Sequence, residues 1–117
     1  MSPSRTITAE KQVDRGADLS RMRRPPTHPG DVFEEEYRKP SGISQAEAAR
    51  RMGMSTNRLN EIVAGKRSVT AENAVLIGAL TNTNPRMWLQ MQSDYDLWHA
   101  LRSTDVTKIT SIGVQRH

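Results

Sequence analysis

The chain contains no cysteine, few aromatic residues and no long apolar run. Without cysteine it can form neither a disulfide framework nor a thiolate metal site. No apolar stretch reaches the length of a transmembrane helix, and no signal-peptide core follows the first residues, so we expect a cytoplasmic protein. The three histidines, His28, His99 and His117, are too scattered to indicate a metal site or a catalytic dyad. Nothing in the sequence therefore predicts an enzyme, a metal site or a cofactor.

The chain does have an excess of positive charge. Its 117 residues include 17 Lys and Arg against 13 Asp and Glu, which gives a net charge of +4. Between Tyr37 and Thr70 there are seven basic and two acidic residues, so this stretch alone carries +5. The length suggests one domain with tails, and the local charge favours an anionic partner.

The charged stretch contains two short predicted helices, within residues 44–64, joined by a tight turn at Gly53. Ser44 can cap the first helix, with Glu47 completing a capping box. Ser55 can cap the second, and Gly65 lies where that helix should end. The predicted inward faces consist of Ala48, Ala49 and Met52 on the first helix and Leu59, Ile62 and Val63 on the second. This is the pattern of a helix-turn-helix whose second helix enters the major groove of DNA.

A plain pair of packed helices in a protein core is the alternative interpretation of this stretch. Hydrogen-bonding side chains at the start of the second helix favour DNA, because base edges are reached there. Lys66 and Arg67 follow directly and could contact phosphates, and Arg50 and Arg51 add charge nearby.

Three further helices are predicted around this pair. The first covers about residues 29–38, with Pro29 in its first turn, and ends at Pro40-Ser41-Gly42. The others cover about 71–81, capped by Thr70, and about 85–102, capped by Asn84. The first helix also carries four acids, Asp31, Glu34, Glu35 and Glu36, which we interpret as a solvated face rather than a catalytic or metal site.

The last predicted helix is apolar over a wider arc than one contact needs. We therefore expect it to pack on its own core and also on a second copy, with burial inside the monomer as the alternative. The candidate dimerisation residues are Trp88, Met91, Tyr95, Trp98 and Leu101, with Leu97 adjoining them.

The two ends of the chain differ from the predicted domain at 27–103. Residues 1–26 are predicted to be a flexible basic extension, whose cluster at 21–24 suits a solvated tail better than a DNA-binding arm. Residues 106–114, within the tail 104–117, are β-prone. They predict either a disordered end or a short strand that forms on association.

Several motifs together match the pattern of a known family. They are His28-Pro29-Gly30-Asp31, Ser44-Gln45, Asn60-Glu61-Ile62, Gly65-Lys66-Arg67-Ser68-Val69-Thr70, Trp88-Leu89-Gln90-Met91-Gln92 and Tyr95-Asp96-Leu97. Over residues 27–100 the sequence resembles the HigA-type antitoxins, a helix-turn-helix family of the lambda-repressor type. The long N-terminal extension departs from the compact pattern of that family and leaves open whether it contacts a toxin.

The resemblance implies an all-α, five-helix, lambda-repressor-like bundle that dimerises through C-terminal elements. It also implies repression of its own operon through a palindromic operator, and binding of a RelE-like, mRNA-cleaving toxin. A stand-alone dimeric transcription regulator without a toxin is the alternative. The DNA-binding residues that follow are Gln45, Lys66 and Arg67 for phosphates, and Ser55, Thr56, Asn57, Arg58 and Asn60 at the start of the reading helix.

Overall fold

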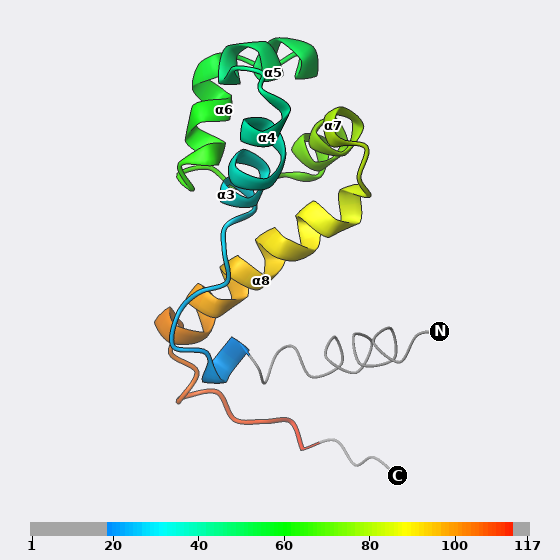
Figure 1. The fold of residues 1–117 in the computed structure, drawn as a ribbon. Helices are drawn as coiled ribbons and strands as arrows, with labels where there is room; N and C mark the ends of the chain where they lie inside the picture. Colours follow the sequence, from blue (N-terminus) through cyan, green and yellow to red (C-terminus); the bar gives the residue numbers. More distant parts are fainter. Residues whose placement is uncertain (1–18, 114–117) are drawn as a thin grey trace, which may run out of the picture.

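Helices account for all the regular structure in residues 19–113, the part of the chain that the computed structural model describes. The first helix consists of α3 (Pro29–Phe33), the π-helical segment η1 (Glu34–Arg38) and α4 (Lys39–Ser41). It is followed by α5 (Gln45–Met52), α6 (Thr56–Val63), α7 (Ala71–Thr81) and α8 (Pro85–Ser103), as Figure 1 shows. The predicted all-α fold is confirmed. Within the described range no helix combines the length and the hydropathy needed to cross a membrane.

The first helix runs further than the prediction of 29–38, because Pro40 does not end it. In a regular α-helix the Pro40 ring would press on the Glu36 carbonyl, to which it has no N–H to donate. The wider π turn before it, in which the Lys39 N–H donates to the Glu34 carbonyl, makes room for the ring. The helix then ends at Gly42, whose φ is 83°.

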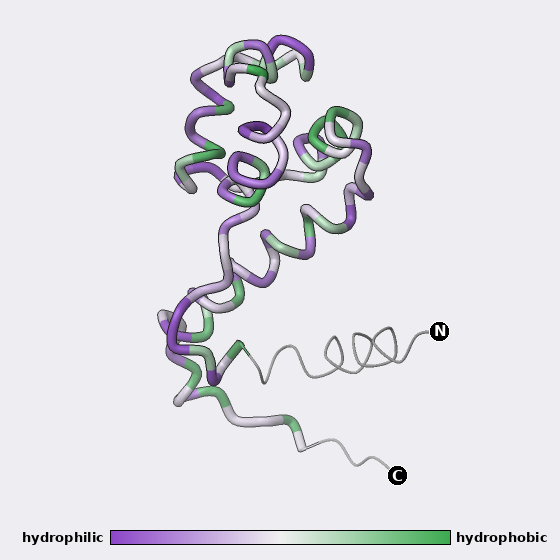
Figure 2. The backbone as a smooth tube through the Cα atoms, viewed as in Figure 1, coloured by the Kyte–Doolittle hydropathy of each residue, from purple (hydrophilic) through white to green (hydrophobic). Residues whose placement is uncertain are grey.

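The core lies where the helices meet. α7 packs along α8, α3 contacts α6 and α8, and α5 contacts α6 and α7. In Figure 2, α7 is mostly hydrophobic, whereas hydrophilic and hydrophobic residues alternate along α8. The largest fully buried apolar side chains here are Phe33, Leu59, Ile62, Ile77 and Trp88.

Gly30 allows the first helix to touch α6. A Cβ atom at this position would lie 1.9 Å from the Ile62 carbonyl oxygen, so only glycine permits this spacing of the two backbones. The His28 side chain caps α3, and its Nδ1 accepts a hydrogen bond from the Gly30 N–H at 2.9 Å.

The distal half of α8 extends beyond the bundle, and a segment from the N-terminal side lies against it (Figure 1). The Trp98 Nε1–H donates to the Met22 carbonyl at 3.0 Å, and Arg102 donates to the carbonyls of Leu19 and Met22. Residues 1–18 of the predicted flexible extension lie outside the described residues. Residues 19–22, in contrast to the prediction of a flexible segment, contact α8, because their backbone carbonyls meet donors at its end.

The C-terminal tail is exposed over residues 104–113 and forms no strand in this range. The described chain offers it no strand to pair with. The two predicted alternatives, a disordered end and a short strand that forms on association, therefore both stay predictions.

Candidate nucleic-acid interface

α5 and α6 form the predicted helix-turn-helix, and local hydrogen bonds set its geometry. The Ser44 Oγ accepts from the Glu47 N–H, and the Ser55 Oγ accepts from the Arg58 N–H, both at 3.0 Å. Gly53 takes the left-handed conformation in the turn, with φ 71°. A complete capping box also requires the Glu47 carboxylate to accept from the Ser44 N–H. That part of the prediction was wrong, because the carboxylate accepts from Arg50 and Arg51 instead.

The inward and outward faces of α6 follow the predicted pattern. Leu59 and Ile62 are fully buried, and Val63 packs against the core. Thr56, Asn57 and Asn60 are exposed on the other side, and their amide and hydroxyl groups face solvent. This face of α6 can therefore meet a ligand that offers hydrogen-bond partners.

Arg58 does not project freely from α6. Its Nη2 lies 3.7 Å from the Glu72 Oε1 in the first turn of α7, and its side chain is 36% exposed. Its Nε is buried and has no hydrogen-bond partner in the described part of the chain. The stem of Arg58 is thus covered by protein, and the end of the guanidinium lies beside an acid that the sequence analysis did not include in the site.

Lys66 and Arg67 follow α6, after Gly65 with φ 77°. Arg67 is paired with Glu61 of α6, with its Nε 2.9 Å and its Nη2 2.7 Å from Oε1. Lys66 is exposed, and its ammonium forms no ion pair within residues 19–113. The two predicted phosphate contacts therefore differ, because Arg67 is neutralised by Glu61 and Lys66 has no acidic partner within the described residues.

Gln45, at the start of α5, is tied to the first helix. Its Nε2 donates to the Glu34 Oε2 at 3.0 Å. Arg38 also donates to both oxygens of the buried Glu34, and these hydrogen bonds lower the pKa of that carboxyl. The network fixes how α5 is set on η1, so the Gln45 amide is held in place rather than free.

Most basic side chains of this region have an acidic partner. The effective positive charge is therefore smaller than the +5 counted from the sequence between Tyr37 and Thr70. Salt bridges join Arg38 to Glu34, Lys39 to Glu35, Arg50 and Arg51 to Glu47, Arg58 to Glu72, and Arg67 to Glu61. The two arginines beside it lower the pKa of Glu47 to about 2. Because Glu34, Glu35 and Glu72 lie outside the stretch from Tyr37 to Thr70, the local count missed them.

The predicted dimerisation face lies largely within the monomer. Trp88 is fully buried, its Nε1–H donates to the Thr83 Oγ1 at 2.7 Å, and its ring meets Phe33 and Tyr37 edge-on. Its assignment to a dimer contact was therefore wrong. The helical spacing of these apolar residues predicted that they share one face of the helix. It could not show whether the chain's own core or a second copy covers that face.

The other residues of that set differ in their exposure. Met91 packs on the core, the Tyr95 ring lies 4.8 Å from His28, and Trp98 is bonded to Met22. Leu101 is 47% exposed and borders a cleft of about 260 Å³ lined by Leu97, Ala100, Leu101, Thr104 and Val106. The most exposed large apolar side chains of α8, Leu97 and Leu101, thus lie in its distal half, while Met87 and Leu89 near its start are each 37% exposed.

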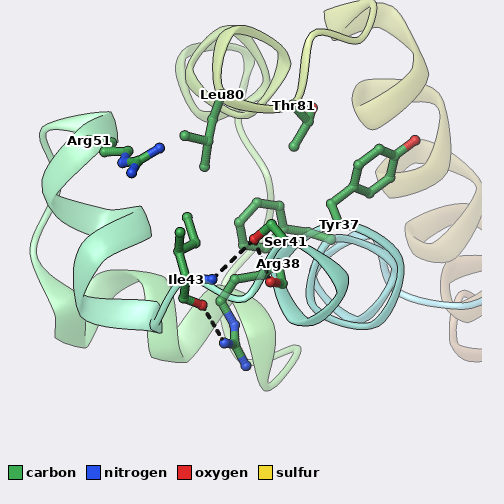
Figure 3. A pocket seen from close by; sticks show the side chains of 8 residues that line it. Tyr37, Arg38, Ser41, Ile43, Arg51, Leu80 and Thr81 are labelled. Atoms are coloured by element: carbon green, nitrogen blue, oxygen red, sulfur yellow. Dashed lines mark hydrogen bonds between the residues drawn. The ribbon is translucent and has the colours of Figure 1, made fainter.

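A second hollow, of about 490 Å³, lies between the first helix, α5 and α7. Figure 3 shows Tyr37, Arg38 and Ile43 on one side of it, with Arg51 and Leu80 across from them. Arg38 closes one edge by donating to the Ile43 carbonyl at 2.7 Å. Its two arginines are already paired with Glu34 and Glu47. Across residues 19–113 no three His, Asp or Glu side chains gather as metal ligands.

Comparison with known proteins places this geometry in a family. Residues 35–88 match the family model described as helix-turn-helix. The chain is 40% identical over 73 residues to virulence-associated protein I of Dichelobacter nodosus, a match that covers 62% of this chain and 68% of the relative.

Two solved structures share the fold. One is an addiction module antidote protein of the HigA family from Coxiella burnetii, with a TM-score of 0.68, 31% identity, and coverage of 75% of this chain and 98% of the other. The second is a Pseudomonas aeruginosa protein in complex with its 18-bp operator DNA, with a TM-score of 0.65, 32% identity, and coverage of 70% and 87%. The chain belongs to the helix-turn-helix family that includes the HigA-type antitoxins.

Proposed function

We propose that this chain is an antitoxin that represses its own operon by binding a palindromic operator as a dimer. The observation that carries this proposal is the exposed outer face of α6, where Thr56, Asn57 and Asn60 lie free beside the unpaired Lys66. The P. aeruginosa relative that shares this fold was solved on its operator. A DNA target of this kind also favours a cytoplasmic location.

In the proposed complex the start of α6 enters the major groove. Asn57 can pair with adenine and Arg58 with guanine, each through two hydrogen bonds. Lys66, Arg67 and Gln45 contact phosphates and fix the register. Thr56 and Asn60 lie on the same face of α6, and the Ser55 hydroxyl, which accepts from the Arg58 N–H, still has its own hydrogen to donate.

Binding should depend strongly on salt. If each half-site neutralises about three phosphates, the slope of log affinity against log salt is on the order of −5 for the dimer. Gel-shift titrations of an operator duplex in rising potassium chloride measure this slope. A flat response would contradict the electrostatic part of the proposal.

Replacement of single side chains separates base readout from phosphate contact. Arg58→Ala should lower the preference for operator over random duplex by about 1–3 kcal/mol. Lys66→Ala should weaken binding to both duplexes by similar factors, because phosphates carry no sequence information directly. If Arg58→Ala leaves the ratio unchanged, α6 does not read bases through this residue.

The proposed toxin is a RelE-like mRNA-cleaving protein, which the family membership favours. Co-expression with the product of the neighbouring reading frame, followed by purification through a tag on one partner, tests this. A stable complex that restores growth supports the antitoxin. A chain that represses transcription but retains no such partner is instead a stand-alone dimeric regulator.

A further inference from the structure

Two arginines of the proposed DNA surface carry acidic partners, but the two pairs differ in geometry. Arg67 and Glu61 are in close contact, with a shortest distance of 2.7 Å, and both lie on or directly after α6. Arg58 and Glu72 lie 3.7 Å apart and join α6 to the first turn of α7. The second pair is beyond hydrogen-bonding distance, so Glu72 partly neutralises Arg58 without using its N–H donors.

Burial restricts where Arg58 can go. Its Nε is buried and has no hydrogen-bond partner among the described residues, whereas the Glu72 side chain is 75% exposed. Because the stem is covered, the guanidinium can move over a small range only. The exposed Glu72 carboxylate lies beside the end of this guanidinium. Any polyanion that reaches Arg58 therefore also meets the negative charge of Glu72.

We propose that Glu72 is a specificity-determining residue that acts through Arg58, an inference that rests on the proposed DNA binding. On arbitrary duplex almost all affinity comes from phosphate contacts. A partly neutralised arginine beside a carboxylate contributes little to such contacts. At the operator, the O6 and N7 atoms of guanine match the terminal N–H donors of the Arg58 guanidinium. Glu72 thus weakens binding to random DNA more than binding to the operator.

The test compares Glu72→Gln with Glu61→Gln. Each variant removes one negative charge from a carboxylate that pairs with an arginine of the proposed interface, so the change in net charge is matched. Dissociation constants are measured for the palindrome that the wild-type chain selects from a pool of randomised duplexes, and for a scrambled duplex of equal length. Circular dichroism checks that both variants are folded.

Glu61→Gln should tighten binding to both duplexes by the same factor, because Arg67 contacts phosphate. Glu72→Gln should tighten binding to the scrambled duplex more, which lowers the ratio of operator to scrambled affinity by about two- to fivefold, the range of an exposed ion pair. In the Arg58→Ala background, Glu72→Gln should leave the ratio unchanged.

Two results would overturn the role proposed for Glu72 without contradicting the proposed DNA binding. The ratio could be the same in Glu72→Gln as in wild type, or its change could persist without Arg58, which would mean that Glu72 contacts a base itself. A wild-type chain with no preference for any palindrome would instead overturn the proposed function, and the role of Glu72 with it.

Discussion

His28 caps α3 through a ring nitrogen that must be unprotonated to do so. Its Nδ1 accepts from the Gly30 N–H, and its ring is buried edge-on to Tyr95. Burial lowers the pKa of His28, against the opposing charges of Asp96 and Asp31. The ordinary value is about 6.5, so the unfolded chain binds the proton first as the pH falls. The stability that His28 contributes is complete above this value and is lost as the pH falls from it towards the folded pKa.

At the residue scale we therefore expect the free energy of unfolding to fall between about pH 7.5 and about pH 5.5. His28→Asn keeps a side chain that can cap a helix but cannot titrate in this range, so its stability should vary less with pH. Urea unfolding at the two pH values measures the difference. An equal pH dependence in wild type and His28→Asn would assign the effect to other groups.

Thr83 supplies the partner of the buried Trp88 indole. Its Oγ1 accepts from Trp88 Nε1–H at 2.7 Å and also bonds Thr81 at 2.8 Å. Thr83→Val keeps the shape but leaves the indole N–H unpaired, which should cost about 1–3 kcal/mol. The thermal midpoint should fall by about 4–8 °C per kcal/mol for a domain of this size. Thr83→Ser retains the hydroxyl and should lose less, and equal losses in both variants would point to packing of the Thr83 methyl.

Residues whose roles are local could be predicted from the sequence alone. Ser44, Ser55 and Thr70 cap their helices as expected, because a cap depends only on the residues three positions ahead. The acidic partners of the cations could not be predicted in the same way. Glu72 reaches Arg58 only because α7 packs beside α6, and sequence spacing carries no such information.

At the element scale, the helix boundaries could be predicted from the positions of glycine, proline and capping residues. The exception is the first helix, where the π turn carries the chain past Pro40 to Ser41. The face of α8 was harder to assign. Apolar spacing identified Trp88 and Trp98 as one stripe, yet Trp88 is in the core and Trp98 meets Met22. The contact of residues 19–22 with α8 was not predicted, because the hydrogen bonds of Trp98 and Arg102 end on backbone carbonyls, which every residue has.

This contact gives a prediction about α8 and the segment that crosses it. Trp98 donates to the Met22 carbonyl, and the Arg102 guanidinium stacks 3.8 Å from the centre of the Trp98 ring. Trp98→Phe removes the donor and keeps an aromatic ring, so residues 19–22 should be released more often while the bundle stays folded. Trypsin should then cut after Arg21 and Arg23 faster than in wild type.

Cleavage after Lys108, in the exposed tail, is the internal control and should proceed at the wild-type rate. Mass spectrometry of the early fragments separates the sites. If cleavage after Arg21 and Arg23 is unchanged while Lys108 is cut normally, the segment does not depend on Trp98 for its position on α8.

At the scale of the whole molecule, the helix-turn-helix and the distal end of α8 lie at opposite ends of the structure (Figure 1). A palindromic site requires two copies of α6 in a fixed two-fold relation. The distal part of α8 offers Leu97 and Leu101 beside Val106 of the tail, all exposed. We expect this surface, rather than the buried Trp88, to pack against the second copy.

Leu101→Glu tests that expectation, because a carboxylate buried unpaired between two copies is costly. Leu101 is 47% exposed within one chain, so the monomer should fold with the wild-type unfolding midpoint. Sedimentation should show a monomer at concentrations where wild type is a dimer, and operator binding should weaken by about tenfold or more, since the second half-site no longer adds to the first. Val75→Glu, at a 57% exposed apolar position on α7, is the matched control and should remain dimeric. A Leu101→Glu protein that still dimerises would move the interface away from α8, and the predicted β-prone segment 106–114 would then be the next to replace.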